Sequence, residues 1–178
     1  MRQSNLTFVW ITDRNQVLTQ MNYKHNALNL IGGHIEEGED CRTALVREIE
    51  EELPGVSIGM DIVVGAEAIG KIEIDGFNKK AHCATKYSIS VFLAYVIKKG
   101  WLENVLCNKE ILNRLVTYQD IYRGITDDGV KISDFPLPQL LSLVRYTERA
   151  FAQIREDSIH CLIPTEYFSL VAYDKEKV

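Results

Sequence analysis

The apolar residues of this chain fall into short runs separated by polar turns, a pattern typical of a mixed α/β protein. Residues 6–11 and 16–20 are β-prone and flank the turn-prone segment 13–15, so they predict a β-hairpin. A shorter apolar run at residues 27–31 predicts another strand, which ends at a pair of glycines. The N-terminal part of the chain therefore reads as sheet.

The middle of the chain predicts two longer strands. Residues 61–74 and 85–98 are both rich in the apolar and β-branched side chains that favour strands. The dipeptide Asp75-Gly76 follows the first run, and this pair of residues is a strong signal for a hairpin turn. We therefore expect the first run to end there and to pair with the second.

A helix is predicted over residues 41–53. Leu45, Ile49 and Leu53 recur every four residues and would form one apolar stripe facing the core. Asp40 precedes the stripe and is of a residue type that caps helix N-termini.

Two further helical segments are predicted toward the C-terminus. The first is a short helix over residues 117–125. A proline-rich boundary at residues 135–138 follows, and a second helix runs from there to about residue 156. The apolar face of this second helix contains Leu140, Leu141, Val144, Phe151 and Ile154.

The segment between the double glycine and residue 52 carries the candidate chemistry. It reads Gly-x5-Glu-x7-Arg-Glu-aliphatic-x-Glu-Glu and runs from Gly33 to Glu52. Seven of its positions are fixed in residue type. A chance match has a probability on the order of one in ten million per start position. A solvated acidic helix face, the ordinary explanation of a charge run, does not require this order.

The carboxylates of this segment are placed to bind a cation. On the predicted helix, Glu48, Glu51 and Glu52 fall within an arc of about 100°. Three carboxylates this close repel one another unless a cation neutralises them, and Mg²⁺ and Mn²⁺ prefer such oxygen ligands. Glu50 points nearly the opposite way and is expected to be a solvated residue. Arg47 lies one turn before Glu51 and is expected to pair with it.

This pattern resembles the signature box of the Nudix hydrolases, which cleave nucleoside diphosphates linked to another group. The resemblance implies a Nudix-type α/β/α sandwich with a mixed sheet. Its core would cover about residues 5–125, and a helical extension would cover about residues 136–178 of a single Nudix domain, residues 1–178. It also implies metal-dependent hydrolysis of a pyrophosphate bond, with Mg²⁺ or Mn²⁺ as the cofactor.

The resemblance implies roles for individual residues. The implied metal ligands are Gly33, through its carbonyl, Glu48, Glu51 and Glu52. Glu51 and Glu52 are also the implied catalytic carboxylates. Arg47 and Glu39 are implied to orient the other groups and to take no part in the chemistry.

Members of the family often use one more glutamate, on a loop after the last long strand, as a metal ligand or general base. Glu110 is the favoured candidate because a short strand and the start of a helix follow it. Glu103 is closer to the predicted strand and reads equally as a solvated turn residue. Asp120 falls at the start of a predicted helix and reads as a cap.

Two features depart from the family pattern. The box normally ends Glu-Glu-x-Gly-aliphatic, and residues 51–56 are one residue longer. Pro54-Gly55 still ends the helix, because proline cannot continue it and glycine is a common residue after a helix C-terminus. Ile31 stands where the family often has proline before the double glycine.

The substrate stays open between a nucleoside triphosphate and a sugar nucleotide. Tyr23 and Lys24 either meet a base and a phosphate or are ordinary loop contacts. His34 either touches phosphate or is a simple loop residue. The alternative function is a catalytically inactive Nudix-like module that senses or regulates through nucleotide binding. All box glutamates are present, which favours the enzyme.

Composition narrows the expected partners. The chain has 178 residues, and its formal charge of −5 argues against a nucleic-acid partner. No apolar run approaches the length needed to span a membrane. The four cysteines form no C-x-x-C pair, so we expect free thiols and a cytoplasmic location.

The C-terminal tail is assigned a packing or homodimer role. Some Nudix-like regulators append a DNA-binding winged helix. Here the tail offers one helix and a short β-prone stretch at residues 161–163, without a basic stripe. A winged helix is therefore not expected.

Overall fold

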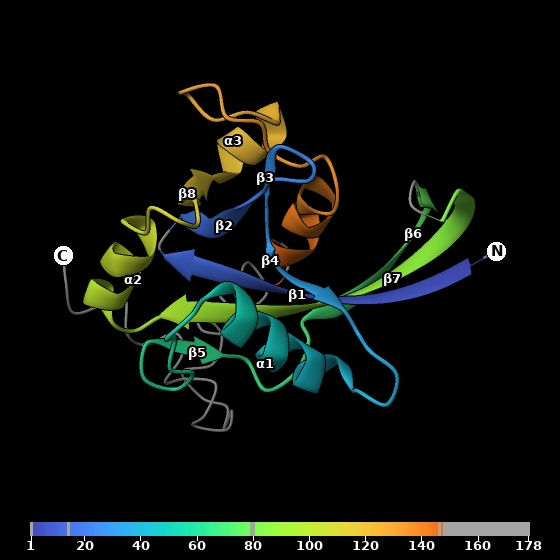
Figure 1. The fold of residues 1–178 in the computed structure, drawn as a ribbon, viewed down its shortest axis with the longest axis horizontal. Helices are drawn as coiled ribbons and strands as arrows, with labels where there is room; N and C mark the ends of the chain where they lie inside the picture. Colours follow the sequence, from blue (N-terminus) through green and yellow to red (C-terminus); the bar gives the residue numbers. More distant parts are fainter. Residues whose placement is uncertain (1, 14, 79–80, 146, 148–178) are drawn as a thin grey trace, which may run out of the picture.

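Two long parallel strands run through the centre of the computed structural model, which describes residues 2–13, 15–78, 81–145 and 147 (Figure 1). Strand β1 (Arg2–Asp13) pairs in parallel with β7 (Cys83–Val96). Their register is continuous from Arg2↔Thr85 to Thr12↔Tyr95. Parallel neighbours need a crossover connection, and the long segment between β1 and β7, which contains α1, provides it.

The remaining strands extend the pair into a mixed sheet of eight strands in the described residues. They are β2 (Gln16–Asn22), β3 (Ala27–Asn29), β4 (Ile31–His34), β5 (Ile62–Val64), β6 (Gly70–Asn78) and β8 (Asn113–Thr117). Strand β1 also pairs with β4 and with the start of β2, and β2 pairs with β3 and β8. Strand β7 pairs with β5 and β6.

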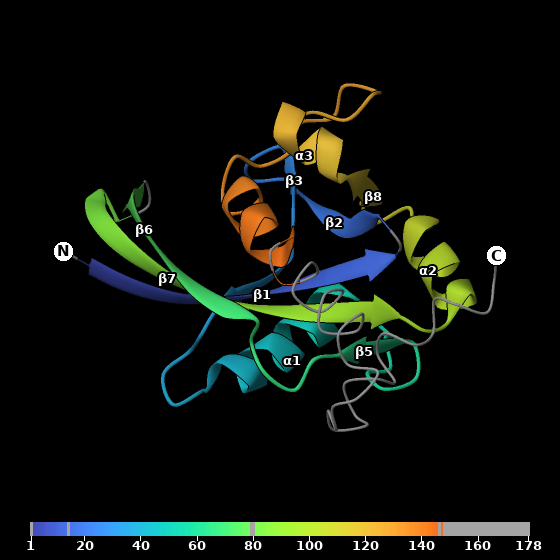
Figure 2. The same cartoon turned by 180° about the vertical axis from the view of Figure 1, so that it is seen from behind.

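Helices cover both faces of the central strands (Figures 1 and 2). Helix α1 (Cys41–Glu52) lies on one side of β1 and β7. Helix α3 (Tyr118–Arg123) and the helical residues 137–145 lie on the other. Helix α2 (Lys99–Leu106) follows β7. The mixed sheet between helical layers confirms the predicted Nudix-type α/β class.

The alternation of side chains along β1 separates two cores. Val9 and Ile11 face the α1-side core, which also contains Leu45, Ile49 and Leu53 of the predicted helical stripe. The next residues along the strand face the opposite way, as the period of two requires. They contribute to the α3-side core, which contains Leu6, Phe8, Trp10, Ile121, Leu140, Leu141 and Val144.

The local predictions for the N-terminal hairpin and for two helices are confirmed. Strands β1 and β2 pair through Thr12↔Val17 and Asp13↔Gln16. Helix α1 begins after Asp40, as predicted. Helix α3 lies within the predicted segment 117–125 and begins with a capping box.

The hairpin turn predicted at Asp75-Gly76 is wrong. Both residues lie inside β6, where they pair with Lys86 and Thr85, and the pairing continues to Asn78↔Cys83. The pairing of β6 with β7 continues for two more residues, so the long strand ladder overrides the turn-forming tendency of these two residues.

Two other boundaries and one helix differ from the sequence prediction. The run 61–74 is two strands, β5 and β6, because residues 65–69 leave the ladder. The run 27–31 is interrupted at Leu30, and β4 then continues through both glycines. Helix α2 was not predicted, since it has only eight residues and contains Gly100.

The predicted C-terminal helix is present as far as the structure describes it. Leu140, Leu141 and Val144 are fully buried, so the described part of this helix packs into the core. Phe151, Ile154 and the stretch 161–163 lie outside the described residues. Within the described chain, no helix has the length and apolar character needed to cross a membrane.

Gly32 permits the close pairing of β4 with β1. Its φ is +135°, a conformation that residues with a Cβ rarely adopt. A Cβ at this position would lie 2.2 Å from the carbonyl oxygen of Thr7. Neither the backbone angle nor the space therefore tolerates a side chain.

We predict that Gly32→Ala lowers the free energy of unfolding by about 3 kcal/mol or more, because strain and a backbone clash add. Urea denaturation measures this. Gly100→Ala is the control, since nothing lies within 4 Å of a Cβ added there. Within helix α2 this change should be neutral or stabilise by up to about 1 kcal/mol. Equal stability of Gly32→Ala and the wild type would contradict the account.

Candidate active site

The N-terminal cap of α1 fixes where the helix begins, and its buried apolar residues fix which side faces the sheet. The Asp40 side chain accepts hydrogen bonds from the backbone N–H of Thr43 at 2.7 Å and of Arg42 at 2.9 Å. These bonds hold the pKa of Asp40 below its usual value, chiefly through Thr43. Leu45 and Ile49 are fully buried against the sheet. The remaining faces of the helix follow from this phase.

The double glycine of β4 receives two carboxylates of α1. The backbone N–H of Gly32 donates to Oε2 of Glu52 at 2.9 Å. A Cβ placed on Gly33 would lie 2.5 Å from Oε1 of Glu48, so this carboxylate occupies the space that a side chain would fill. The structure therefore brings Gly33, Glu48 and Glu52 together, as the sequence predicted.

Arg47 connects the carboxylates of this region. Its Nε and Nη2 donate to Glu39 at 3.0 and 3.1 Å, and its Nη1 donates to Glu48 at 2.9 Å. Nη2 also donates to the carbonyl oxygen of His34 at 2.9 Å. The predicted pair with Glu51 is present at 3.6 Å, but it is the longest of these contacts and the Glu51 side chain is 60% exposed. Arg47 therefore orients Glu48 more directly than Glu51.

These contacts also shift proton affinities. The hydrogen bonds from Arg47 lower the pKa of Glu39, and the backbone N–H of Glu36 adds to the effect. The Arg47 guanidinium has its pKa raised by Glu39 and Glu48, so it stays charged. One fixed cation is thus shared by two of the carboxylates beside β4 and offsets part of their negative charge.

Within the described residues, no Lys or Arg side chain pairs with Glu52. Burial chiefly, with the negative charges of Glu48 and Glu51, raises the pKa of Glu52 to about 7 despite the opposing hydrogen bond from Gly32. Glu50 is exposed on the helix, which agrees with the predicted phase. The last turn of α1 therefore holds more negative charge than its surroundings neutralise.

The donor set fits a hard divalent cation. Carboxylate and carbonyl oxygens are the ligands that Mg²⁺ and Mn²⁺ prefer, and a cation would relieve the crowding around Glu52. Among the described residues, no three His, Cys, Asp or Glu side chains form a ready metal cluster. Glu48 is held by Arg47 and Glu51 extends outward, so binding would require these side chains to turn.

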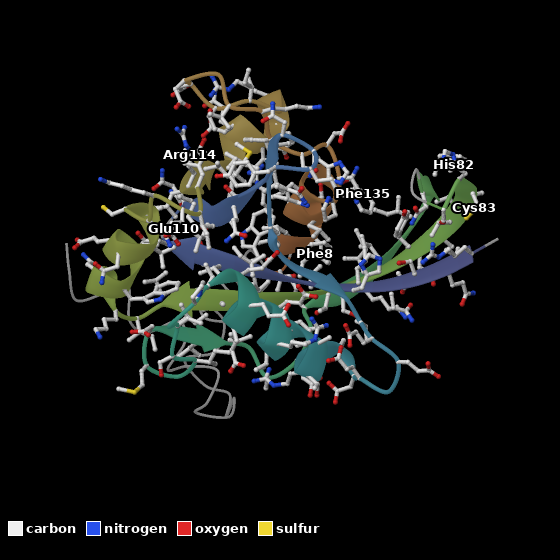
Figure 3. The ribbon with its side chains drawn as sticks, viewed as in Figure 1. Phe8, His82, Cys83, Glu110, Arg114 and Phe135 are labelled. Carbon is white, nitrogen blue, oxygen red and sulfur yellow. The ribbon has the colours of Figure 1, made fainter. Side chains whose placement is uncertain are left out.

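Other predicted site residues lie on exposed loops. Tyr23 is 67% exposed and shares the turn between β2 and β3 with exposed Lys24. The His34 side chain is exposed at the end of β4. Glu110 is exposed in the loop before β8, where its backbone N–H donates to Oδ1 of Asn108 at 2.8 Å (Figure 3).

The alternative candidates for the additional carboxylate have other surroundings. Glu103 lies exposed on α2, and the predicted turn there is wrong. Asp120 completes the capping box of α3 with Thr117 and also pairs with Arg123, so it acts as the predicted cap.

Sequence reasoning missed Gln20, whose Nε2 donates to the carbonyl oxygen of Glu52 at 2.8 Å. The available signal was its position two residues after Leu18, which lies in the α1-side core. Residues two apart on a strand share a face, so Gln20 had to point toward the α1 side.

A family model described as NUDIX domain matches residues 1–96 of the chain. No curated protein sequence matches the chain. A solved NUDIX hydrolase from Nitrosomonas europaea is similar with a TM-score of 0.55 at 15% identity, covering 82% of this chain and 90% of that one.

Two further solved structures are similar at 15% identity. A C. elegans Ap4A hydrolase binary complex gives a TM-score of 0.53 over 86% of this chain and 99% of that one. A UDP-X diphosphatase gives a TM-score of 0.51 over 83% of this chain and 65% of that one. At this identity the structures establish a shared fold, and the family model covers more than half of the 178 residues. The chain belongs to the Nudix family.

Proposed function

We propose that this protein hydrolyses a pyrophosphate bond in a nucleoside diphosphate derivative, with Mg²⁺ or Mn²⁺ as its cofactor. One observation carries the proposal. The carboxylates of Glu48 and Glu52 lie against the double glycine of β4, where no side chain separates them from the backbone. This concentrates oxygen ligands and negative charge at one edge of the sheet.

The cofactor would be held by Glu48, Glu51, Glu52 and the carbonyl of Gly33. When bound, a divalent cation neutralises pyrophosphate charge and makes a coordinated water more acidic. The raised pKa of Glu52 supports this assignment, because like charges around a buried carboxyl disfavour its ionised form until a cation arrives.

The remaining groups have orienting and proton-transfer roles in this proposal. Arg47 holds the Glu48 carboxylate through Oε1, and Glu39 fixes Arg47 in turn. The N–H of Gly32 donates a hydrogen bond to Oε2 of Glu52 and restricts the rotation of that carboxylate. Glu110 is proposed to accept a proton from the attacking water, a role that needs a carboxylate within hydrogen-bond reach.

The proposed substrates are nucleoside triphosphates and sugar nucleotides. Two proteins of the same fold are named for Ap4A and for UDP-X hydrolysis, which supports the broader class of nucleotide derivatives. Exposed Tyr23 is proposed to contact a base, and Lys24 and His34 to contact phosphate. The free thiols of Cys41, Cys83 and Cys107 are consistent with a proposed cytoplasmic location.

Glu52→Gln should lower kcat by a hundredfold or more, about 2.7 kcal/mol of barrier, because it removes one negative ligand while keeping the shape. Chromatography of the nucleotide products from a panel of nucleoside triphosphates and sugar nucleotides with Mg²⁺ measures this. Glu50→Gln is the matched control on the same helix and should keep the wild-type rate, since Glu50 faces solvent. A wild type that binds nucleotides and cleaves none would favour a sensing module instead.

Stability without metal should fall as pH rises. The pKa of Glu52 is raised from 4.5 to about 7 in the folded state. The contribution of Glu52 to folding stability is therefore complete below pH 4.5 and is lost as the pH rises through 7. In EDTA, the free energy of unfolding of the wild type should fall by on the order of 2 kcal/mol relative to that of Glu52→Gln across this range. Urea titrations at pH 5 and 8 measure the difference.

Added Mg²⁺ should restore stability at pH 8 in the wild type and much less in Glu52→Gln, because a bound cation stabilises the folded state. The same pH dependence in both proteins would show that Glu52 is not the group responsible.

Arg47→Lys should lower kcat at least tenfold, because an ammonium cannot reproduce the guanidinium contacts to Glu39 and Glu48. Arg42→Ala is the control on the same helix. Arg42 donates to the carbonyl oxygens of Gly65 and Ala66, away from the carboxylates, so its loss should affect stability and spare kcat. Steady-state kinetics at saturating substrate distinguish them, and unchanged kcat in Arg47→Lys would contradict the orienting role.

A further inference from the structure

A chain of side-chain amides connects the end of α1 to the loop that carries Glu110. Nε2 of Gln20 donates to the carbonyl oxygen of Glu52 at 2.8 Å and to Oδ1 of Asn113 at 3.1 Å. Nδ2 of Asn113 donates to the carbonyl oxygen of Val105 at 3.2 Å. Three segments far apart in sequence thus meet through two side chains.

The chemistry of the two end groups fixes which atoms of the two amides donate and which accept. The carbonyl oxygens of Glu52 and Val105 can only accept, so both amides must present nitrogen to them. That leaves Oδ1 of Asn113 to accept the second N–H of Gln20. The two amide nitrogens and Oδ1 of Asn113 therefore each have a partner of the correct kind.

The sheet brings the two amides into register. Gln20 and Asn113 are directly opposite each other in the antiparallel β2–β8 pair. Side chains at such positions share one face of the sheet. Asn113 is only 5% exposed, so its hydrogen bonds are protected from competition with water.

Each end of this series of hydrogen bonds holds a segment that carries a candidate active-site residue. Glu52 is the last residue of α1, so its carbonyl has no partner within the helix, and Gln20 supplies one. Asn113 holds the last turn of α2, and its Nδ2 also lies 3.5 Å from the carbonyl oxygen of Ile111. Glu110 lies between these two attachment points.

We infer that Gln20 and Asn113 are positioning residues that set the Glu110 loop relative to the Glu52 end of α1. The inference rests on the proposed hydrolytic function and on Glu110 as its proton acceptor. A change in either amide would move the loop and misplace the Glu110 carboxylate. Misplacement of about 1 Å can cost up to a hundredfold in rate.

The test is a double-mutant cycle on kcat in the full chain with Mg²⁺, using the best substrate found for the wild type. Gln20→Met keeps the side-chain length and removes both donors. It should lower kcat about tenfold to a hundredfold. In the Glu110→Gln background, the same change should cost less than twofold, because the carboxylate it positions is already gone.

Thr19→Val is the matched control. Thr19 precedes Gln20 on β2, is fully buried, and donates to the carbonyl oxygen of Arg114 at 3.0 Å across the same strand pair. It contacts neither α1 nor the Glu110 loop through that bond. Its substitution should lower the thermal midpoint and leave kcat within twofold of the wild type.

Asn113→Asp provides a second route if Gln20→Met does not fold. It keeps an oxygen to accept from Gln20 and loses the donor to Val105, so it should show the same non-additivity with Glu110→Gln. Multiplicative losses, or wild-type kcat in both amide variants, would overturn the inference and leave the proposed function intact. Wild-type kcat in Glu110→Gln would overturn the inference and the proton-accepting role of Glu110, and would leave the proposed hydrolysis itself intact. A wild type that cleaves no nucleotide would overturn both.

Discussion

The close approach of α1 to β4 is the constraint on which the rest of the site depends. It is possible because Gly32 and Gly33 present only backbone to the helix. The N–H of Gly32 binds the Glu52 carboxylate, and the missing Cβ of Gly33 leaves room for that of Glu48. A side chain at Gly33 would displace the Glu48 carboxylate of α1, and a side chain at Gly32 would clash with β1 and disturb the strand that receives Glu52.

This approach has an electrostatic cost that the protein meets in two ways. Arg47 is shared between Glu39 and Glu48, and its charge offsets part of the negative charge near the start and middle of α1. Glu52 accepts from the Gly32 N–H, and burial together with the charges of Glu48 and Glu51 raises its pKa to about 7. The unbalanced carboxylate is the part of the site that a cation would stabilise most. Membership of the Nudix family and the proposed metal-dependent hydrolysis are consistent with that imbalance.

The sequence predicted what short-range patterns control and missed what distant pairing controls. Helix α1, its Asp40 cap and the outward position of Glu50 follow from spacing within one segment. The main partners of Arg47 do not, because the fold brings in Glu39 from outside the helix. The false turn at residues 75–76 arose likewise, since the β6–β7 ladder overrides a local preference. The Gln20–Asn113 contact depends on strand register, which no local pattern specifies.

Oxygen-isotope labelling tests the central claim, hydrolysis of a phosphoanhydride at the α1–β4 junction, most directly. The full chain is incubated with Mg²⁺, a nucleoside triphosphate or a sugar nucleotide, and ¹⁸O-enriched water, and the products are followed by ³¹P NMR. The account predicts nucleoside monophosphate or diphosphate with ¹⁸O on phosphorus in one product, and no reaction in EDTA. Absence of cleavage across both substrate classes, or cleavage that leaves ¹⁸O on a sugar carbon, would contradict it.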